Sequence, residues 1–315
     1  MRRKLKSPLP QRYGLDPVRL KLPGEGPWAT VRDHLVERLP TVAPERIDLM
    51  FREERVVDPN GTLAVDAPFV PNSFIWFHRD LPAETPVPFD VTVVRRDETL
   101  LVVDKPHFLA TTPRGKHVLE TALVRLRREL DLPGLSPAHR LDRVTAGLVM
   151  FVIRPEHRGA YQTLFHDRMV RKEYEAIAPV DPALELPRTV RSRIIKERGV
   201  LAAQEVPGEP NSETFVQLQE QRGELGRYRL RPETGRTHQL RVHMNSLGIP
   251  ILGDDYYPVL AERPEGDFSR PLQLLARTLE FTDPLTGEER RFESRLQLRA
   301  WADFESWAAG HVVHD

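Results

Sequence analysis

Apolar spacing near the amino terminus predicts a small folded unit that follows an extended arm. Proline and charge dominate to about Trp28, so residues 1–27 are expected to form a basic, extended arm. Over residues 30–39, apolar side chains share one helical face, and Thr30 is placed to cap that helix. An Asn-Gly turn follows at 60–61, and prolines 82, 86 and 88 punctuate a linker. These signals predict a unit over residues 28–80.

A second unit is expected over residues 81–315. Apolar runs or alternation typical of strands cover 99–106, 148–152, 172–179 and 226–232. Helical spacing covers 118–130, 157–170, 237–248 and 299–310. Strands and helices are mixed without a regular alternation, so the predicted fold class is α+β rather than a doubly wound sheet.

Three of these segments carry more specific expectations. Within 226–232, Tyr228 and Leu230 alternate with arginines, which predicts a sheet edge or a face open to solvent. Thr237 is placed to cap the helix over 237–248, and Gly248 to end it. The last segment, 299–310, reads as one amphipathic helix whose inward positions are Trp301, Phe304 and Trp307.

Composition narrows the chemistry and the expected location. The chain has 315 residues, no cysteine and a formal net charge of +0. Disulfides, thiolate catalysis and cysteine-ligated zinc are therefore excluded. No apolar run approaches the roughly 20 residues of a membrane helix, and the basic start lacks the apolar segment of a signal peptide. We expect a cytoplasmic protein without a membrane partner.

Charge is less balanced locally than over the whole chain. An acid-free run near the start contains Arg2, Arg3, Lys4, Lys6 and Arg12. A second run, opposed only by Glu233, contains Arg227, Arg229, Arg231, Arg236 and Arg241. Such runs are usually solvated surface, and the alternative is a footprint for nucleic acid.

The stretch "HRLDRVTAGLVMF" (139–151) places an acid between two arginines, directly before an apolar run. A carboxylate held at the mouth of a buried strand is rigid, and Arg140 and Arg143 favour the ionised form of Asp142. Such a group can act as a nucleophile or as an electrostatic anchor. The alternative is that Asp142 caps a turn and pairs with Arg143.

The stretch from Glu233 to Tyr257, "ETGRTHQLRVHMNSLGIPILGDDYY", adds a second polar cluster. Arg236 precedes a helix amino terminus, where free backbone N–H groups attract phosphate. Arg241 lies one turn into that helix, on the face of His238. Taken singly, His238 and His243 could be structural histidines and Arg241 a surface ion pair. No third ligand stands at helical spacing from the histidines, so no metal site is predicted.

Together, "LLVVDKP", "HRLDRVTAGLVMF", "KEYEAI" and the 233–257 stretch resemble the RluA-type pseudouridine synthases in order and spacing. The resemblance covers roughly residues 89–281. It implies a central mixed, mainly antiparallel sheet flanked by helices. It also implies that Asp142 is the catalytic aspartate, Tyr174 the active-site tyrosine and Arg241 the partner of the aspartate. Arg140 would help to eject the target base, and residues expected at the RNA are Arg236, Thr237, His238 and Arg229.

The chain departs from the family pattern at several positions. Ala146 stands where the family usually has Ser, His107 where it has Gly, Leu275 where it has His, and Pro258 where it has Gly. These departures affect the subfamily and substrate more than the reaction. Residues 28–80 weakly resemble the alpha-L RNA-binding domain. Few basic residues lie on the expected helix face, so the alternative is a degenerate domain with a packing role.

The implied reaction moves the uracil linkage from N1 to C5 within an RNA chain. Nothing is oxidised and no phosphate is transferred, so no cofactor and no metal are expected. The expected partner is structured ribosomal or transfer RNA, and the expected state is a monomer. Two alternatives remain open: an RNA-binding protein on the same fold without chemistry, and a nucleoside-bond hydrolase that would release free uracil.

Overall fold

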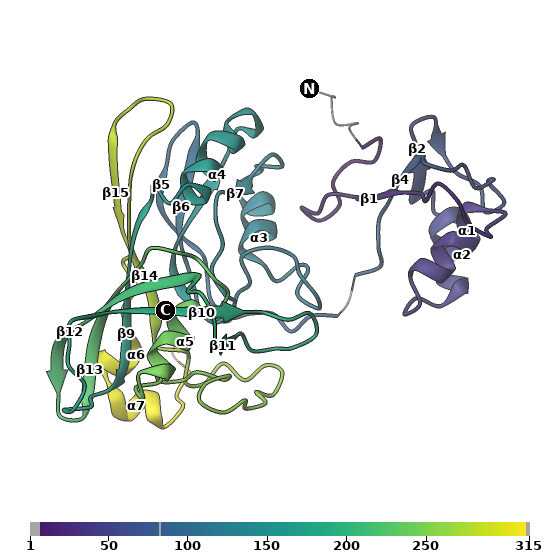
Figure 1. The fold of residues 1–315 in the computed structure, drawn as a ribbon. Coiled ribbons are helices and arrows are strands. Elements are labelled where there is room, and N and C mark those ends of the chain that lie inside the picture. The colour runs from purple at the N-terminus through teal and green to yellow at the C-terminus, as the bar shows by residue number, and fades with distance from the viewer. Residues whose placement is uncertain (1–6, 82, 313–315) are drawn as a thin grey trace. The chain divides into compact units, whose positions relative to one another are not determined.

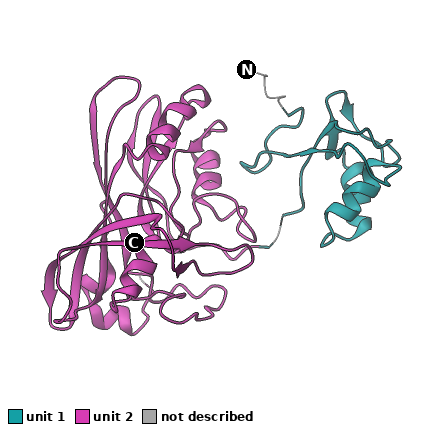
Figure 2. Ribbon diagram, viewed as in Figure 1, with its two compact units in different colours: residues 1–83 teal, residues 84–315 magenta. Residues whose placement is uncertain are grey.

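The computed structural model describes residues 7–81 and 83–312 and divides the chain into two compact units, residues 1–83 and 84–315 (Figure 2). The division after Ala83 lies close to the boundary expected near residue 80. The run formed by Arg2, Arg3, Lys4 and Lys6 lies outside the described residues. Within the described part of the chain, no helix is long and apolar enough to span a lipid bilayer.

The first unit is a four-stranded antiparallel sheet with two helices (Figure 1). Its elements are β1 (Val18–Lys21), α1 (Val31–Arg38), α2 (Pro44–Arg52), β2 (Val56–Asp58), β3 (Gly61–Thr62) and β4 (Phe74–Phe77). The predicted cap of α1 is confirmed: the Thr30 side chain accepts from the Asp33 N–H, and the Asp33 carboxylate accepts from the Thr30 N–H. The core joins Leu35, Ile47 and Phe77.

The amino-terminal arm differs from the expectation. Residues Val18–Lys21 form β1, which pairs with β4 in the small sheet, and the following Leu22 is only 1% exposed. The physical reason is alternation, because Val18 and Leu20 turn their apolar side chains onto the core of this unit while Arg19 faces away. The stretch from Val18 onward is therefore part of the folded unit, not an extended arm.

The second unit is built on one large sheet whose strands follow the order β11-β10-β12-β13-β9-β14-β8-β6-β5, with β15 beside β14 and β7 beside β8 (Figure 1). Among the described strands of this sheet, β8 and β14 form a parallel pair and the other pairs are antiparallel. The prediction of an α+β fold with a mixed, mainly antiparallel sheet is confirmed. The strands are β5 (Thr92–Arg96), β6 (Leu100–Lys105), β7 (Ser136–Pro137), β8 (Ala146–Val152), β9 (Arg171–Pro179), β10 (Arg188–Ile195), β11 (Gln204–Val206), β12 (Ser212–Arg222), β13 (Leu225–Pro232), β14 (Leu274–Thr282) and β15 (Glu289–Glu293). The helices are α3 (Ala122–Glu129), the 3-10 turn Pro155–His157, α4 (Arg158–His166), α5 (Gln239–Ser246), α6 (Arg299–Ala302) and α7 (Phe304–Ala308).

Helices cover both faces of this sheet. On one face, α3 packs on β6 and β8, and α5 packs on β9, β12 and β13. On the other face, α4 packs on β6, β8 and β14, and α6 and α7 pack around Ile177 and Leu275. Val149 and Phe151 contact the α3 layer, while Leu148 and Met150 contact the α4 layer. Coverage from both sides explains why the sequence of β8 is a continuous apolar run.

Of the two alternatives for residues 226–232, the face open to solvent is the one that holds. β13 lies between β12 and β9, and its arginines share a partly exposed face opposite the buried Tyr228 and Leu230. The expectation for the carboxy-terminal helix needs correction. The 299–310 segment is two short helices, because Asp303 leaves helical geometry and its carboxylate caps α7 by accepting from the Ser306 N–H. Trp307 is buried as predicted, whereas Phe304 is 43% exposed.

The expected linker is bound to the second unit from Glu84 onward. The Glu84 carboxylate accepts hydrogen bonds from the backbone N–H groups of Val118, Leu119 and Glu120, at 2.7 to 3.1 Å. Val87 is buried, and its N–H donates to the Glu120 carboxylate at 2.7 Å. These contacts fix the start of the second unit against the segment that leads into α3.

Two histidines inside the second unit hold backbone and side chains as neutral rings. His139 stacks on Phe165 at 4.3 Å, and its Nε2 accepts from the Met150 N–H at 3.1 Å. His243 is fully buried among Ser192, Ser212 and Thr214. Burial lowers the pKa of His139 to about 3 and the pKa of His243 to about 4. His243 is thus a structural histidine, one of the readings that the sequence left open.

A fragment that begins at Glu84 should fold alone, because each unit has its own core and the Glu84 contacts lie within the second unit. We expect the fragment to unfold in one cooperative transition and the full chain to show an additional one. Calorimetry on both proteins measures this. Glu84→Ala in the fragment should lower the midpoint temperature of its unfolding. An insoluble fragment or a non-cooperative transition would contradict the division of the chain into two independently folding units.

Stability should fall as pH decreases from about 6.5 to about 4, because unfolded histidine titrates near pH 6.5 whereas His139 and His243 keep folded pKa values of about 3 and about 4. Over that window the unfolded chain binds more protons than the native chain. His139→Gln retains an acceptor for the Met150 N–H and does not titrate. The free energy of unfolding of this variant should therefore fall less steeply as the pH decreases. Urea unfolding over this pH range measures the slope. The exposed His166→Gln is the control, and equal slopes in all three proteins would contradict the argument.

Candidate active site

A pocket of about 120 Å³ opens on the face of the sheet that carries α3 and α5. Its lining includes Asp142 and Arg140 before β8, Tyr174 on β9, and Arg236, His238 and Arg241 around the start of α5. Pockets for drug-sized ligands usually measure about 300–1,000 Å³, so this one has room for a single small ring system. The structure therefore brings together residues that are far apart in the sequence.

Asp142 stands at the first position of a tight turn that leads into β8. The Thr145 N–H donates to the Asp142 carbonyl at 3.1 Å, and β8 begins at the next residue, Ala146. Gly147 has φ +108°, and a Cβ at that position would lie 2.4 Å from the Ala276 carbonyl oxygen on β14. The close approach of β8 and β14 thus requires glycine there, and it places the turn at the edge of the pocket.

The end of β6 and the segment that follows it clamp the backbone on both sides of Asp142. The Thr111 hydroxyl donates to the Leu141 carbonyl at 2.9 Å and accepts from the Leu141 N–H. His107 Nδ1 donates to the Val144 carbonyl at 2.8 Å. Lys105 Nζ donates to three carbonyls, one of them that of Arg143 at 3.3 Å. The turn carrying Asp142 is therefore held in one place by hydrogen bonds from both flanks.

Burial shifts the pKa values of the residues that form this clamp. It lowers the pKa of Lys105 to about 7, against the opposing effect of the Asp142 charge, and it lowers the pKa of His107 to about 4. His107 is consequently a neutral ring, as expected for a donor to the Val144 carbonyl. It occupies the position where a glycine was expected from the family pattern.

The two arginines that flank Asp142 in sequence are not its partners. Arg140 is exposed at the pocket, and the Arg143 guanidinium turns toward Phe108, where it donates to the backbone carbonyl at 3.4 Å. The ion pair that the structure records for Asp142 is with Arg241, whose Nη1 lies 3.8 Å from Asp142 Oδ2. The alternative that Asp142 pairs with Arg143 does not describe the structure.

Arg241 has a closer partner that the sequence did not reveal. Its Nε and Nη2 donate to the two carboxylate oxygens of Asp254 at 2.7 and 2.6 Å, and both side chains are almost fully buried, at 2% and 1% exposure. Burial disfavours the Arg241 charge, but Asp254 more than compensates, so the pKa of Arg241 is raised. The guanidinium also lies 4.9 and 5.5 Å from the rings of Tyr256 and Tyr257.

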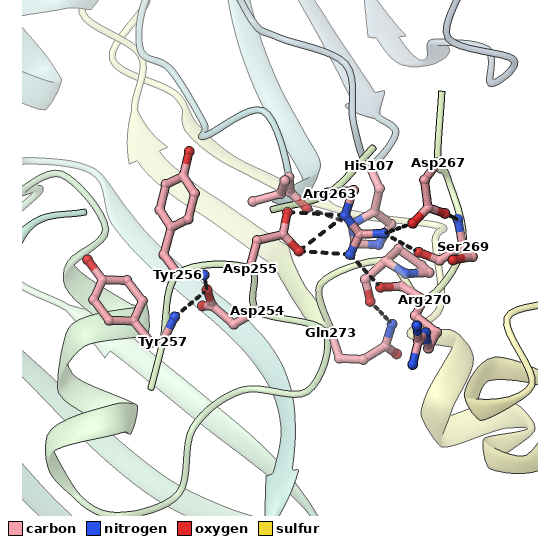
Figure 3. Close-up of polar contacts among 12 residues, drawn as sticks. His107, Asp254, Asp255, Tyr256, Tyr257, Arg263, Asp267, Ser269, Arg270 and Gln273 are labelled. Atoms are coloured by element: carbon pink, nitrogen blue, oxygen red, sulfur yellow. Dashed lines mark hydrogen bonds and ion pairs between the residues drawn. The ribbon is translucent and has the colours of Figure 1, made fainter. Parts of the chain in front are cut away.

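The Asp254 carboxylate is itself held by its own turn. Its Oδ1 accepts from the backbone N–H groups of Tyr256 at 2.8 Å and Tyr257 at 3.2 Å, as Figure 3 shows. Arg241 is thus neutralised mainly by Asp254. The 3.8 Å separation from Arg241 leaves Asp142 without a close hydrogen-bonded cation, and its side chain remains 33% exposed at the pocket.

Arg263 closes the loop that follows this turn. Its guanidinium binds the carboxylates of Asp255 and Asp267 and the backbone carbonyls of Ser269 and Arg270 (Figure 3). It also lies 5.2 Å from the ring of Phe108, next to the clamp on Asp142. These contacts tie the loop between Asp254 and β14 to the clamp.

Tyr174 lies on β9 opposite Leu230 of β13, and its ring packs in both apolar clusters of this face. Burial, with a smaller contribution from the Asp142 charge, raises the pKa of the Tyr174 hydroxyl above its ordinary value. The phenol is therefore neutral at physiological pH.

The start of α5 differs from the expected capping. His238 precedes the helix with φ 57° and ψ 17°, so Thr237 lies too early to cap it and is exposed. Gln239 organises the turn instead, because its Oε1 accepts from the Arg236 N–H at 3.0 Å. His238 and Arg241 both line the pocket, and His238 Nδ1 lies 3.1 Å from the Tyr257 hydroxyl.

Of the two arginines expected at the RNA in this region, one lies at the pocket and the other does not. Arg236 is exposed at the pocket, and its Nε donates to the Asn211 carbonyl at 3.1 Å. Arg229 is not among the lining residues and pairs with Glu173 at 3.1 Å. The lining also includes Lys172, which the sequence analysis did not single out although it stands two residues before Tyr174 on β9.

The geometry agrees with similarities to known proteins. Residues 99–246 match the family model described as RNA pseudouridylate synthase. The chain is 33% identical to human pseudouridylate synthase RPUSD2 over 69% of this chain and 38% of that protein. It is 30% identical to the dual-specificity RNA pseudouridine synthase RluA of Haemophilus influenzae over 64% of this chain and 92% of that protein.

A solved structure shows the same relationship. Human RNA pseudouridylate synthase domain containing 4 matches with a TM-score of 0.51 and 25% identity, over 65% of this chain and 88% of that one. The family match contains Asp142, Tyr174 and Arg241, and the relative from Haemophilus influenzae is matched over nearly its whole length. The chain therefore belongs to the RluA-type pseudouridine synthases, isomerases that convert uridine to pseudouridine in RNA.

Proposed function

We propose that this pocket isomerises a uridine of structured ribosomal or transfer RNA and that Asp142 carries the chemistry. The observation that supports this most directly is the arrangement of three charges. Arg241 is already paired with Asp254 at 2.6 Å, and Asp142 lies 3.8 Å from the same guanidinium with its carboxylate open to the pocket. Arg241 can thereby orient the Asp142 carboxylate without occupying it in a close hydrogen bond.

The reaction is an isomerisation, and its atoms balance within the nucleotide. The N1–C1′ bond breaks, the uracil turns, a C5–C1′ bond forms, and the hydrogen at C5 leaves as a proton while N1 gains one. Asp142 either attacks the nucleotide covalently or removes a sugar proton to give a glycal. Both routes require an ionised, fixed carboxylate at the detached bond.

The target base must leave its stack to reach a pocket of this size. Unstacking costs a few kcal/mol and is least for a nucleotide in a loop or a single strand. In the proposal, Arg140 enters the vacated space and Tyr174 packs on the flipped base. The raised pKa of Tyr174 favours this packing role over removal of the C5 proton as a phenolate.

The proposal retains the sequence-based expectation of a monomer that acts in the cytoplasm. Light scattering at working concentration tests the monomer, and fractionation of cells that produce the chain tests the location.

Asp142→Asn should abolish pseudouridine formation, because it removes the charge but keeps the shape of the side chain. RNA affinity should stay within about tenfold, or 1.4 kcal/mol. Arg241→Ala should resemble it because the carboxylate loses its orienting cation, whereas Arg140→Ala should lower turnover without abolishing it. Tritium release from 5-³H-uridine RNA and filter binding measure both properties. Release at the parent rate from Asp142→Asn would refute the role of Asp142. No release by the parent would favour pure RNA binding, and free uracil would identify a hydrolase.

Asp254→Asn should lower both stability and turnover. It leaves the buried Arg241 charge without its bidentate partner, a change that typically costs about 3–5 kcal/mol. Arg241 should then move toward Asp142 and hold it in a closer ion pair, which occupies the carboxylate and lowers turnover. Urea unfolding and tritium release measure these effects. Asp255→Asn, a neighbouring carboxylate that pairs with Arg263, is the matched control. An unchanged turnover in Asp254→Asn would refute the dependence of Arg241 on Asp254.

A further inference from the structure

Lys172 enters the pocket from the same face of β9 as Tyr174. Side chains alternate along a strand, so Lys172 and Tyr174, two residues apart, lie on one side and Arg171 and Glu173 on the other. Lys172 is also one of the residues that line the pocket. The sequence motif "KEYEAI" therefore delivers a cation and an aromatic ring to the same cavity.

The ammonium of Lys172 has little compensation within the protein. Its Nζ donates to the Thr234 carbonyl at 3.5 Å, the limit of a hydrogen bond, and among the described residues no carboxylate lies within 4.0 Å of it. Burial lowers the pKa of Lys172, with Glu233 opposing from a greater distance and Arg168 adding repulsion. A partly desolvated charge with one long hydrogen bond gains more from an arriving anion than an exposed lysine does.

The surrounding charges make the pocket a place for an anion although the whole chain is neutral. The lining contains Arg140, Lys172, Arg236 and Arg241 but Asp142 as its one carboxylate. Arg241 is neutralised by Asp254. Three cations around the opening thus remain available to a ligand.

One contact locates the Lys172 ammonium within the pocket. Its Nζ reaches the Thr234 carbonyl at 3.5 Å, and Thr234 is itself one of the lining residues. The ammonium therefore lies on the Thr234 side of the pocket.

We propose that Lys172 is a phosphate-binding residue, whose ammonium binds a backbone phosphate of the nucleotide that enters the pocket. The inference rests on the proposed function for the identity of the ligand, since an RNA chain brings a phosphate with every base. Lys172 and Tyr174 would then hold the two ends of one nucleotide, the phosphate and the base. A neutral ligand, or the detached uracil alone, would not need a cation on the Thr234 side of the pocket.

Salt dependence of RNA binding tests the proposal. Removing a single cation that neutralises a phosphate reduces the slope of log affinity against log salt by about 0.7 to 0.9. We expect this reduction for Lys172→Met, together with a roughly tenfold weaker affinity. Lys172→Arg should retain the slope. The matched control is Arg171→Met, on the opposite face of β9 and 83% exposed in its side chain, which should change neither property. The probe is a labelled uridine-containing RNA hairpin in a filter-binding assay.

Turnover distinguishes phosphate binding from a role at the base. Lys172→Met should slow tritium release at limiting 5-³H-uridine RNA but approach the parent rate at saturating RNA. A slope equal to that of the parent, or a rate that stays low at saturation with unchanged affinity, would overturn the proposal. The affinity arm needs no turnover, so the absence of pseudouridine formation in the parent would refute the reaction and leave the phosphate contact tested on its own.

A double-mutant cycle separates a specific effect of Lys172 from misfolding of the variant. Glu233→Gln removes a carboxylate whose charge acts on Lys172 and repels an arriving phosphate, and it should strengthen RNA binding in the parent. The same change should have a smaller effect in the Lys172→Met background, because the two residues act on the same phosphate. Equal effects in both backgrounds would overturn the assignment.

Discussion

The buried ion pair between Arg241 and Asp254 is the interaction on which the site depends. A guanidinium cannot lie beneath this pocket at 2% exposure unless an anion compensates its desolvation. Asp254 does so with both oxygens, and two backbone N–H groups in turn hold Asp254. Because Asp254 compensates the Arg241 charge, Asp142 interacts with Arg241 electrostatically at 3.8 Å without forming a close hydrogen-bonded ion pair with it. The result is a carboxylate that is oriented but still open to a ligand.

Rigidity at Asp142 comes from the backbone rather than from side-chain packing. Thr111 and His107 hold the carbonyls on either side of the residue. Helices α3 and α5 pack on the same sheet face, and Val144 of the turn contacts both of their clusters. A small displacement of the turn would therefore break several hydrogen bonds at once, which favours a single geometry for the carboxylate.

Much of this arrangement could be predicted from the sequence, where the signal was local or matched a motif. Continuous apolar residues in β8 and alternation in β9 predicted those strands, and Asp142, Tyr174 and Arg241 were found as motif residues that now lie around one pocket. The partner of Arg241 could not be read, because the choice between Asp142 and Asp254 depends on how a loop folds back onto α5. The capping of α5 could not be predicted either, because His238 adopts left-handed geometry and separates Thr237 from the start of the helix. The break at Asp303 was also missed, because the apolar spacing on its two sides is continuous with a single helix. Lys172 was readable in principle, since its spacing from Tyr174 already placed both on one face of a strand.

The position of β14 has a consequence for when the site can exist. Asp142 precedes β8, Tyr174 lies on β9, and these two strands do not pair with each other; β14 lies between them and joins them. Residues 274–282 are made after both β8 and β9, so a growing polypeptide holds the aspartate and the tyrosine on two separate half-sheets until β14 inserts. Contacts this distant in sequence form late in folding. The pocket is thus divided between two half-sheets during synthesis, and its two halves come together only after β14 has been made.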